Sequence, residues 1–248
     1  MASGINKNLN VIILLTGTIN PMGMSKTKLL DKEIRKLQYI DSIKFYLQKT
    51  NLKIVFIENS NENISSYFQE EINNNRIEIL TFNGNNYPKY LGKGFGELKI
   101  IEYGITNSNL IKDCDFIIKI TGRLIVLNIN KFIKQIKKSS KIELLLDLKV
   151  NLTYSESRLF GCYKNFFNDY FFEYQNYLDD SKKRHFEDAL LKSALIAISE
   201  GKKYEPFKNY LNISGYSGTN NKNYKESILK IFYKNIYMKL KYKLICFS

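Results

Sequence analysis

The chain has 248 residues, of which 44% are hydrophobic and 25% charged, a balance typical of a globular protein with one sizeable core. Its formal net charge of +14 favours an anionic partner, which could be nucleic acid, an anionic membrane surface or a phosphorylated small molecule. The single histidine excludes a multi-histidine metal site, and the three scattered cysteines lack metal-ligand spacing. Because no apolar run reaches the length of a bilayer and the N-terminus is polar, we expect a cytoplasmic protein without a signal or a spanning anchor.

The first half alternates between strand and helix patterns. The apolar run 11–15 predicts a buried first strand that opens into the loop Thr16, Gly17, Thr18. A helix is predicted over 31–49, with apolar positions at Ile34, Leu37, Ile40 or Ile43, and Leu47. Further strands are predicted at 52–57, 77–82 and 116–120, and further helices at 62–73 and 97–110. This alternation predicts an α/β fold with a mostly parallel sheet flanked by helices.

The second half is less regular. Strands are predicted at 142–150 and 157–163, and helices at 166–177 and 183–199, the last capped by the segment 179–181. No long linker divides the chain. We therefore expect a single domain over 1–222, followed by a C-terminal basic helix over 223–248.

The most informative segment is 115–123, an apolar strand that ends in Thr121, Gly122 and Arg123. Such an end places backbone N–H groups and a fixed positive charge where open α/β sheets hold anionic ligands. We interpret it as a phosphate site. The alternative is an ordinary turn with a solvated arginine.

Two further small-residue segments could hold a ligand. The run 92–97, which contains Lys93 and Gly94, lies between a strand and a helix, where glycines allow close backbone approach and a helix N-terminus favours an anion. Its G-x-G-x-G spacing matches neither the dinucleotide fingerprint nor a Walker loop, and a plain flexible loop is the alternative. The segment 215–220, with Ser217, Gly218 and Thr219, could fold over a ligand or be a surface turn.

Glu187 and Asp188 are adjacent carboxylates near the start of the late helix. Because successive helical residues lie about 100° apart, at most one can point squarely into a site. A carboxylate is the usual base for a hydroxyl nucleophile. The alternative is that both acids only interact with the helix dipole.

Taken together, these parts resemble the nucleotide-sugar-dependent glycosyltransferases of the GT-A fold, in particular bacterial enzymes of capsular polysaccharide and lipopolysaccharide synthesis. The resemblance covers residues 9–223 and is strongest at Glu187 and Asp188, which look like that family's Glu-Asp pair. It implies that Asp188 is the base and that Glu187 contacts the acceptor. It also implies that the loop from Thr16 touches the nucleotide and that Glu58 and Asn59, after the second strand, lie near its base or ribose.

The chain departs from that family at its metal-binding Asp-x-Asp motif, where it has Lys119, Ile120, Thr121, Gly122 and Arg123. Fixed cations can replace a metal ion electrostatically at a diphosphate. The resemblance therefore implies a UDP-, GDP- or CMP-type sugar donor whose phosphates contact Arg123 with Lys119 or Lys93, and no metal ligand. A Mn²⁺ or Mg²⁺ ion held by Asp113 or Asp115 is the alternative, as is a Lys119 that points away from the site.

The C-terminal segment carries seven lysines after position 221 and places Leu229, Phe232, Ile236 and Leu240 at helical spacing. This pattern predicts an interfacial helix on an anionic membrane, which would place the protein on the inner face of the plasma membrane beside a glycan or lipid-linked acceptor. The alternative is a helix that docks its apolar stripe on the core.

Two other classes remain. A nucleic-acid-binding protein without catalytic activity would use the net charge and the 18 tyrosines, but no recognised binding motif occurs. A sugar nucleotidyltransferase is less favoured because the first loop lacks that family's glycine-rich, arginine-containing signature.

Overall fold

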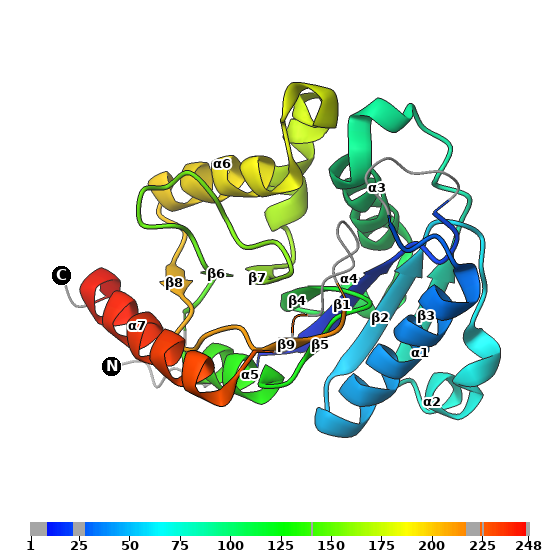
Figure 1. Cartoon of the computed structure of the whole chain (residues 1–248), viewed down its shortest axis with the longest axis horizontal. Helices are drawn as coiled ribbons and strands as arrows, with labels where there is room; N and C mark the ends of the chain where they lie inside the picture. Colours follow the sequence, from blue (N-terminus) through cyan, green and yellow to red (C-terminus); the bar gives the residue numbers. More distant parts are fainter. Residues whose placement is uncertain (1–8, 22–27, 140, 217–223, 225, 247–248) are drawn as a thin grey trace.

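A seven-stranded sheet forms the centre of the computed structural model, which describes residues 9–21, 28–139, 141–216, 224 and 226–246 (Figure 1). In spatial order its strands are β3 (Ile77–Thr81), β2 (Lys53–Glu58), β1 (Val11–Gly17), β4 (Phe116–Thr121), β7 (Leu159–Tyr163), β6 (Leu144–Leu146) and β8 (Tyr204–Pro206). Only β7 runs antiparallel to its neighbours. A second, two-stranded sheet joins β5 (Ile125–Val126) to β9 (Ile213–Ser214). The predicted α/β fold class, with a mostly parallel sheet flanked by helices, is confirmed.

Helices cover both faces of the sheet (Figure 1). The helices of the described residues are α1 (Lys32–Lys49), α2 (Gln69–Asn73), α3 (Gly92–Asn107), α4 (Asn109–Lys112), α5 (Ile129–Lys138), α6 (Phe186–Ser199) and α7 (Ile228–Cys246). Side chains of β1 alternate between two cores, because Ile13 packs with α1 and α5 whereas Ile12 packs with α3 and α6. This two-sided burial explains why the strand has no polar residue before Thr16.

The parallel register brings the carboxyl ends of three central strands together. Thr16 lies opposite Thr121, and Gly17 lies opposite Glu58. Just beyond β4, the Gly122 amide donates to the Thr16 carbonyl oxygen at 2.9 Å, and a Cβ atom on Gly122 would lie 2.6 Å from that oxygen. The absence of a side chain on Gly122 therefore lets the two strand ends approach closely.

The local structure departs from the sequence prediction in several places. α1 has the predicted extent, but its buried face contains Arg35, Tyr39 and Tyr46, while Ile34 and Leu37 are exposed. α3 begins at Gly92 instead of 97, and the strand expected over 142–150 is ordered as a strand only in β6. The segment expected as a helix over 166–177 forms a π turn (Phe167–Phe171) and a 3₁₀ segment (Phe172–Tyr177). α5, β8 and the small sheet were not anticipated.

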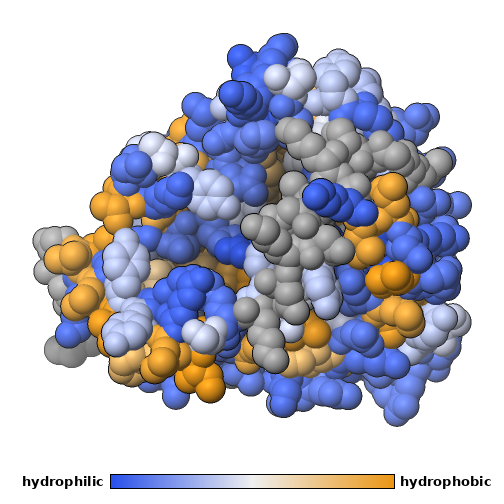
Figure 2. All heavy atoms as spheres, viewed as in Figure 1, coloured by the Kyte–Doolittle hydropathy of each residue, from blue (hydrophilic) through white to orange (hydrophobic). Residues whose placement is uncertain are grey.

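α7 docks on the rest of the protein through a narrow polar face. The Lys241 ammonium donates to Asp147 Oδ1 at 2.5 Å, Asn235 Oδ1 accepts from the Tyr210 amide at 3.0 Å, and Met238 is buried. The predicted apolar stripe faces solvent instead, with Leu229 72% exposed and Leu240 57% exposed. The alternative in which this stripe docks on the core is therefore wrong. Figure 2 shows hydrophobic and hydrophilic residues intermixed along this helix.

Candidate functional site

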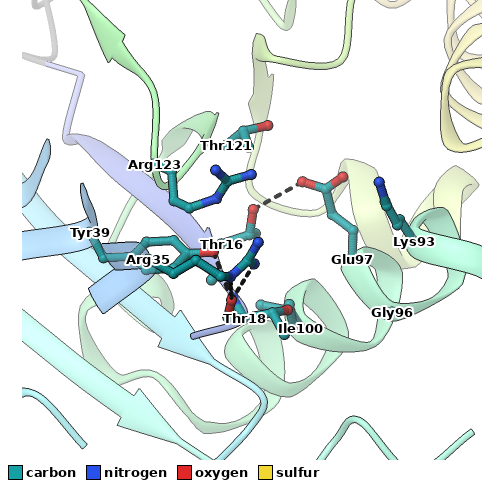
Figure 3. Close-up of a pocket in the computed structure, with 11 residues that line it drawn as sticks. Thr16, Thr18, Arg35, Tyr39, Lys93, Gly96, Glu97, Ile100, Thr121 and Arg123 are labelled. Carbon is teal, nitrogen blue, oxygen red and sulfur yellow. Dashed lines mark hydrogen bonds between the residues drawn. The ribbon is translucent and has the colours of Figure 1, made fainter. Parts of the chain in front are cut away.

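A cleft of about 140 Å³ opens at the carboxyl ends of β1 and β4 (Figure 3). The predicted site residues that line it are Thr16, Gly17, Thr18, Lys93, Thr121 and Arg123. The other lining residues come from α1 and α3. Gly96 and Glu97 lie in the predicted segment 92–97, whereas Arg35, Tyr39 and Ile100 were not predicted. The cleft thus lies where the topology of an open α/β sheet places a ligand.

Arg35 and Tyr39, one turn apart on α1, hold the loop that follows β1. The Arg35 Nε atom donates to the carbonyl oxygens of Thr18 and Ile19 at 2.9 and 3.1 Å. The Tyr39 hydroxyl accepts from the Thr18 amide at 2.8 Å. Burial lowers the pKa of the Arg35 guanidinium, and the nearby positive charge of Arg123 lowers it further. The loop is therefore fixed by a cation that is itself only 5% exposed.

Arg123 faces the same cleft from the turn after β4. It is 9% exposed, and its Nη1 atom donates to Gln38 Oε1 at 3.1 Å. Within the described part of the chain, neither Arg35 nor Arg123 forms an ion pair with a carboxylate. Two buried guanidinium groups with only neutral acceptors leave a positive charge that an anion in the cleft would stabilise.

Lys119 is oriented differently from the prediction. Its ammonium group is fully buried, donates to Glu97 Oε1 and to the Ser157 carbonyl oxygen at 3.1 Å, and lies over the rings of Phe160 and Phe186. Glu97 Oε1 also accepts from Thr16 Oγ1 at 2.9 Å. Lys119 therefore supports the floor of the cleft through Glu97, and it does not line the cleft as a direct phosphate ligand would.

Glu58 and Asn59 lie beneath the loop after β1 and do not line the cleft. Glu58 Oε1 accepts from the Ile19 amide at 2.8 Å and from the Ser60 hydroxyl, and its Oε2 accepts from the amides of Ser60 and Glu62 at 2.9 Å. Burial raises the pKa of the Glu58 carboxyl, an effect opposed by these hydrogen bonds. We therefore assign Glu58 a structural role instead of the predicted contact with the donor.

Asn59, at the carboxyl end of β2, is a better candidate than Glu58 for contact with a ligand. Its Oδ1 atom accepts from Thr18 Oγ1 at 2.7 Å, so the side chain reaches a residue that lines the cleft. Its Nδ2 atom is buried without a hydrogen-bond partner. Unsatisfied buried donors are rare, and this one lies next to the ligand-facing loop.

The glycines after β3 belong to the first turns of α3 and not to a flexible loop. A Cβ atom on Gly94 would lie 3.0 Å from the backbone nitrogen of Phe186, so this glycine lets α3 approach α6. At Gly92, the corresponding space is taken by the Asp180 carboxylate. The Asp180 carboxylate therefore lies against Gly92 at the start of α3, and Gly94 faces α6 instead of the cleft.

Glu187 and Asp188 lie in the first turn of α6, next to α3. Glu187 Oε1 accepts from Ser157 Oγ at 2.6 Å, and Ser157 also binds Lys119 through its carbonyl oxygen. Asp188 Oδ2 accepts from the His185 amide at 2.9 Å and so satisfies an N-terminal backbone donor of the helix. Glu187 is thus connected to the cleft floor, and neither acid lines the cleft.

The remaining predicted positions lie elsewhere. Ser217, Gly218 and Thr219 fall outside the described residues. Asp113 and Asp115 precede β4, at the end of the strand opposite the cleft, and the Asn10 amide donates to Asp115 Oδ2 at 3.0 Å. Neither residue therefore lies at the cleft. The described residues contain no group of three or more His, Cys, Asp or Glu side chains placed to hold a metal ion.

No protein-family model and no curated protein matches the chain. Solved structures with distant similarity include a candidate glucose-1-phosphate thymidylyltransferase from Bacillus anthracis in complex with sucrose, with a TM-score of 0.49, 11% identity, and coverage of 92% of this chain and 95% of that one. They also include the glycosyltransferase GlyE of Streptococcus pneumoniae TIGR4, with a TM-score of 0.44, 9% identity, and coverage of 81% and 45%. Core-mannan synthase A from Aspergillus fumigatus, in a Mn/GDP form, has a TM-score of 0.42, 9% identity, and coverage of 98% and 87%.

The structural role of Glu58 can be tested with Glu58→Gln. In either orientation an amide group would face backbone N–H donors that now bind a carboxylate oxygen. We expect the free energy of unfolding to fall by about 2 kcal/mol in urea denaturation. The control is Glu70→Gln, an exposed acid on α2, for which we expect a change within about 0.5 kcal/mol. Equal stabilities of the two variants would contradict the structural role.

Proposed function

We propose that the chain transfers a sugar from a nucleotide diphosphate sugar to a hydroxyl group of a glycan or lipid-linked acceptor. The observation that carries this proposal is the convergence of Arg35 and Arg123 on one cleft at the carboxyl ends of β1 and β4. Guanidinium groups bind phosphate oxygens through paired N–H donors. A diphosphate is therefore the ligand that best matches the charge and the position of the cleft.

The donor would lie across the strand ends. Its diphosphate would contact Arg35, Arg123 and Lys93, which line the cleft from α1, the turn after β4, and α3. Its nucleoside would extend toward Asn59 after β2, and its sugar toward α3 and α6. Because fixed cations can meet the charge of the leaving diphosphate, we propose a reaction that is independent of Mn²⁺ and Mg²⁺.

The acceptor hydroxyl would be activated from α6. In this proposal Asp188 takes the proton of the acceptor hydroxyl group. The hydroxyl oxygen then forms a bond to the anomeric carbon of the donor sugar while the bond from that carbon to the diphosphate breaks. Attack opposite the leaving group inverts the configuration. Glu187, whose Oε1 accepts from Ser157, would contact the acceptor beside the cleft floor.

α7 would bring the enzyme to the acceptor by adsorbing to an anionic membrane surface. It carries no acidic residue, and of its five lysines Lys241 is buried against Asp147 while the other four lie on its more accessible sides. Its apolar side chains Leu229, Phe232 and Leu240 are exposed. Exposed apolar side chains among lysines favour the interface of an anionic bilayer. No helix among the described residues has the length and apolar character needed to cross a bilayer.

The nucleotide site can be tested with Arg123→Gln, which removes the guanidinium group and keeps a polar side chain beside Gln38. We expect wild-type protein to be stabilised against heating by one class among UDP, GDP, CMP, dTDP and their sugars, with or without EDTA. Calorimetry should then show a dissociation constant about tenfold higher for the variant, while the exposed control Arg184→Gln retains wild-type affinity.

Three results would contradict the proposal in different ways. Binding that requires Mn²⁺ would exclude metal independence. Formation of pyrophosphate from a nucleoside triphosphate and a sugar phosphate would identify a nucleotidyltransferase. A failure to bind any nucleotide, together with a strongly salt-dependent affinity for oligonucleotides, would identify a nucleic-acid-binding protein.

The base can be tested with Asp188→Asn. The asparagine side-chain oxygen can still accept from the His185 amide, so we expect the melting temperature to change little. Loss of the base should lower kcat about 10²- to 10⁴-fold, measured as release of the nucleoside diphosphate from the bound donor with water or a glycan as acceptor. Asp41→Asn, on the exposed side of α1, is the control. A comparable loss in Glu187→Gln together with an active Asp188→Asn would show that Asp188 is not the base.

The membrane surface can be tested by replacing Leu229, Phe232 and Leu240 together with glutamine. We expect co-sedimentation with phosphatidylglycerol-containing vesicles to fall at least fivefold, because each exposed apolar side chain contributes about 1 kcal/mol to insertion. The control replaces Ile34 and Leu37, two exposed apolar residues of α1, with glutamine and should bind like wild type. Equal binding of both variants would exclude α7 as the membrane contact.

A further inference from the structure

Glu97 is the only carboxylate among the described residues that line the cleft. It projects from α3 one turn after Lys93 and lies across the cleft from the cationic side chains of Arg35 and Arg123. A carboxylate in a phosphate site is unfavourable unless its charge is balanced, because it repels the ligand. Its presence in this cleft therefore requires an explanation.

Lys119 supplies the balancing charge from the core side of the cleft. The ammonium group is completely buried, whereas the Glu97 side chain is 22% exposed, so the pair presents its carboxylate to the cleft and its cation to the core. Thr16 Oγ1 and Lys119 Nζ both donate to the same oxygen, Oε1. The ammonium group thereby balances the charge of the carboxylate, holds it in one orientation, and reduces its repulsion of an anion in the cleft.

The second oxygen of Glu97 is left available to a ligand. Oε2 has no hydrogen bond within the part of the chain that the structure describes. Figure 3 shows the carboxylate projecting over the cleft, with Oε2 on the side away from Thr16. An ionised carboxylate oxygen only accepts hydrogen bonds, so its natural partner on a nucleotide sugar is a hydroxyl group.

The position of Glu97 indicates which hydroxyl group it would bind. Figure 3 places Glu97 and Lys93 across the cleft from Arg35 and Tyr39. The nucleoside edge at Asn59 lies beyond Thr18, on the side of β2, whereas Lys119 connects Glu97 to Ser157 and so toward Glu187 on α6. With a diphosphate between the arginines, Glu97 faces the end of the donor that carries the transferred sugar.

We infer that Glu97, held by Lys119 and Thr16, accepts a hydrogen bond from a hydroxyl group of the transferred sugar and thereby selects a hydroxylated sugar donor. This inference rests on the proposed function, because it assumes that the diphosphate lies between Arg35 and Arg123. It assigns Glu97 to substrate recognition and Lys119 to positioning. A purely structural ion pair would leave the affinity for the sugar unaffected.

The test compares two ligands of the same protein, the nucleoside diphosphate and its nucleotide sugar. For Glu97→Gln we expect the dissociation constant of the nucleotide sugar, measured by calorimetry, to rise about tenfold, the effect of losing a charge-assisted hydrogen bond. The dissociation constant of the nucleoside diphosphate should change less than about twofold. The matched control is Glu102→Gln, which changes an acid on the same helix that pairs with Lys99 in solvent.

A second variant separates recognition from folding. Glu97→Gln leaves the buried Lys119 without its anionic partner, so the fold could be weakened. The double variant Glu97→Leu/Lys119→Met removes both charges, and it should show the same selective loss of affinity for the sugar with a cooperative melting transition. Replacing a buried ion pair with apolar residues is often neutral for stability.

The outcomes distinguish this inference from the proposed function. If wild-type protein binds no nucleotide, the proposed function and this inference fail together. If wild-type protein binds both ligands and Glu97→Gln lowers the affinity for both equally, or changes the affinity for neither, only the proposed role of Glu97 fails. A sugar analogue that lacks the recognised hydroxyl should bind wild type and Glu97→Gln with equal affinity, and a persistent difference would also overturn the inference.

Discussion

The buried ammonium group of Lys119 is the constraint on which the cleft depends. It joins β4 to α3 through Glu97, to the segment before β7 through the Ser157 carbonyl oxygen, and to the ring of Phe186 on α6. Removing one partner from a buried ion pair costs about 3–5 kcal/mol, because the other charge remains in a poorly solvated place. These elements are therefore held in one arrangement, and the carboxylate of Glu97 is held with them over the cleft.

The fold could be predicted from the sequence wherever burial on both faces removes polar residues from a strand. Continuous apolar runs revealed β1, β2 and β4, and parallel pairing then required that Thr16 and Thr121 meet at one edge of the sheet. The predicted extent of α1 was also correct, but its buried face was only partly correct, because Ile40 and Ile43 are buried as predicted whereas Ile34 and Leu37 are exposed. A prediction from hydrophobic periodicity treats arginine as exposed and isoleucine as buried. In the structure Arg35 is buried, because it donates to carbonyl oxygens of the loop after β1, and Ile34 faces solvent. Tertiary contacts that no local pattern contains decided that orientation.

The part of the site at the strand ends could be predicted from the sequence, but the part that the helices contribute could not, because it depends on tertiary contacts. Strand ends are visible in the sequence, but the contributions of helices to a cleft depend on their rotation. Tyr39 was therefore missed, and Glu97 was not identified as a site residue although it lies in the predicted segment 92–97. One signal could have identified Arg35, because arginine occupies only five positions in a chain with 38 basic residues. Where lysine is the default cation, an arginine indicates a position that needs a planar group with several donors. The glycines of α3 were misread because the close approach of Gly94 to Phe186 is a contact between distant segments.

The location of the charges carries more information than the net charge of +14. Arg35 and Arg123 are buried and face a small cleft, and their guanidinium groups donate to neutral acceptors. Most of the lysines of α7 lie outside its buried face, beside exposed apolar side chains. Salt screens exposed charges over about 8 Å at physiological ionic strength and buried ones much less. A cleft of fixed guanidinium groups therefore suits the selective binding of a small phosphorylated ligand, whereas lysines on the surface of a helix suit reversible adsorption to a broad anionic surface.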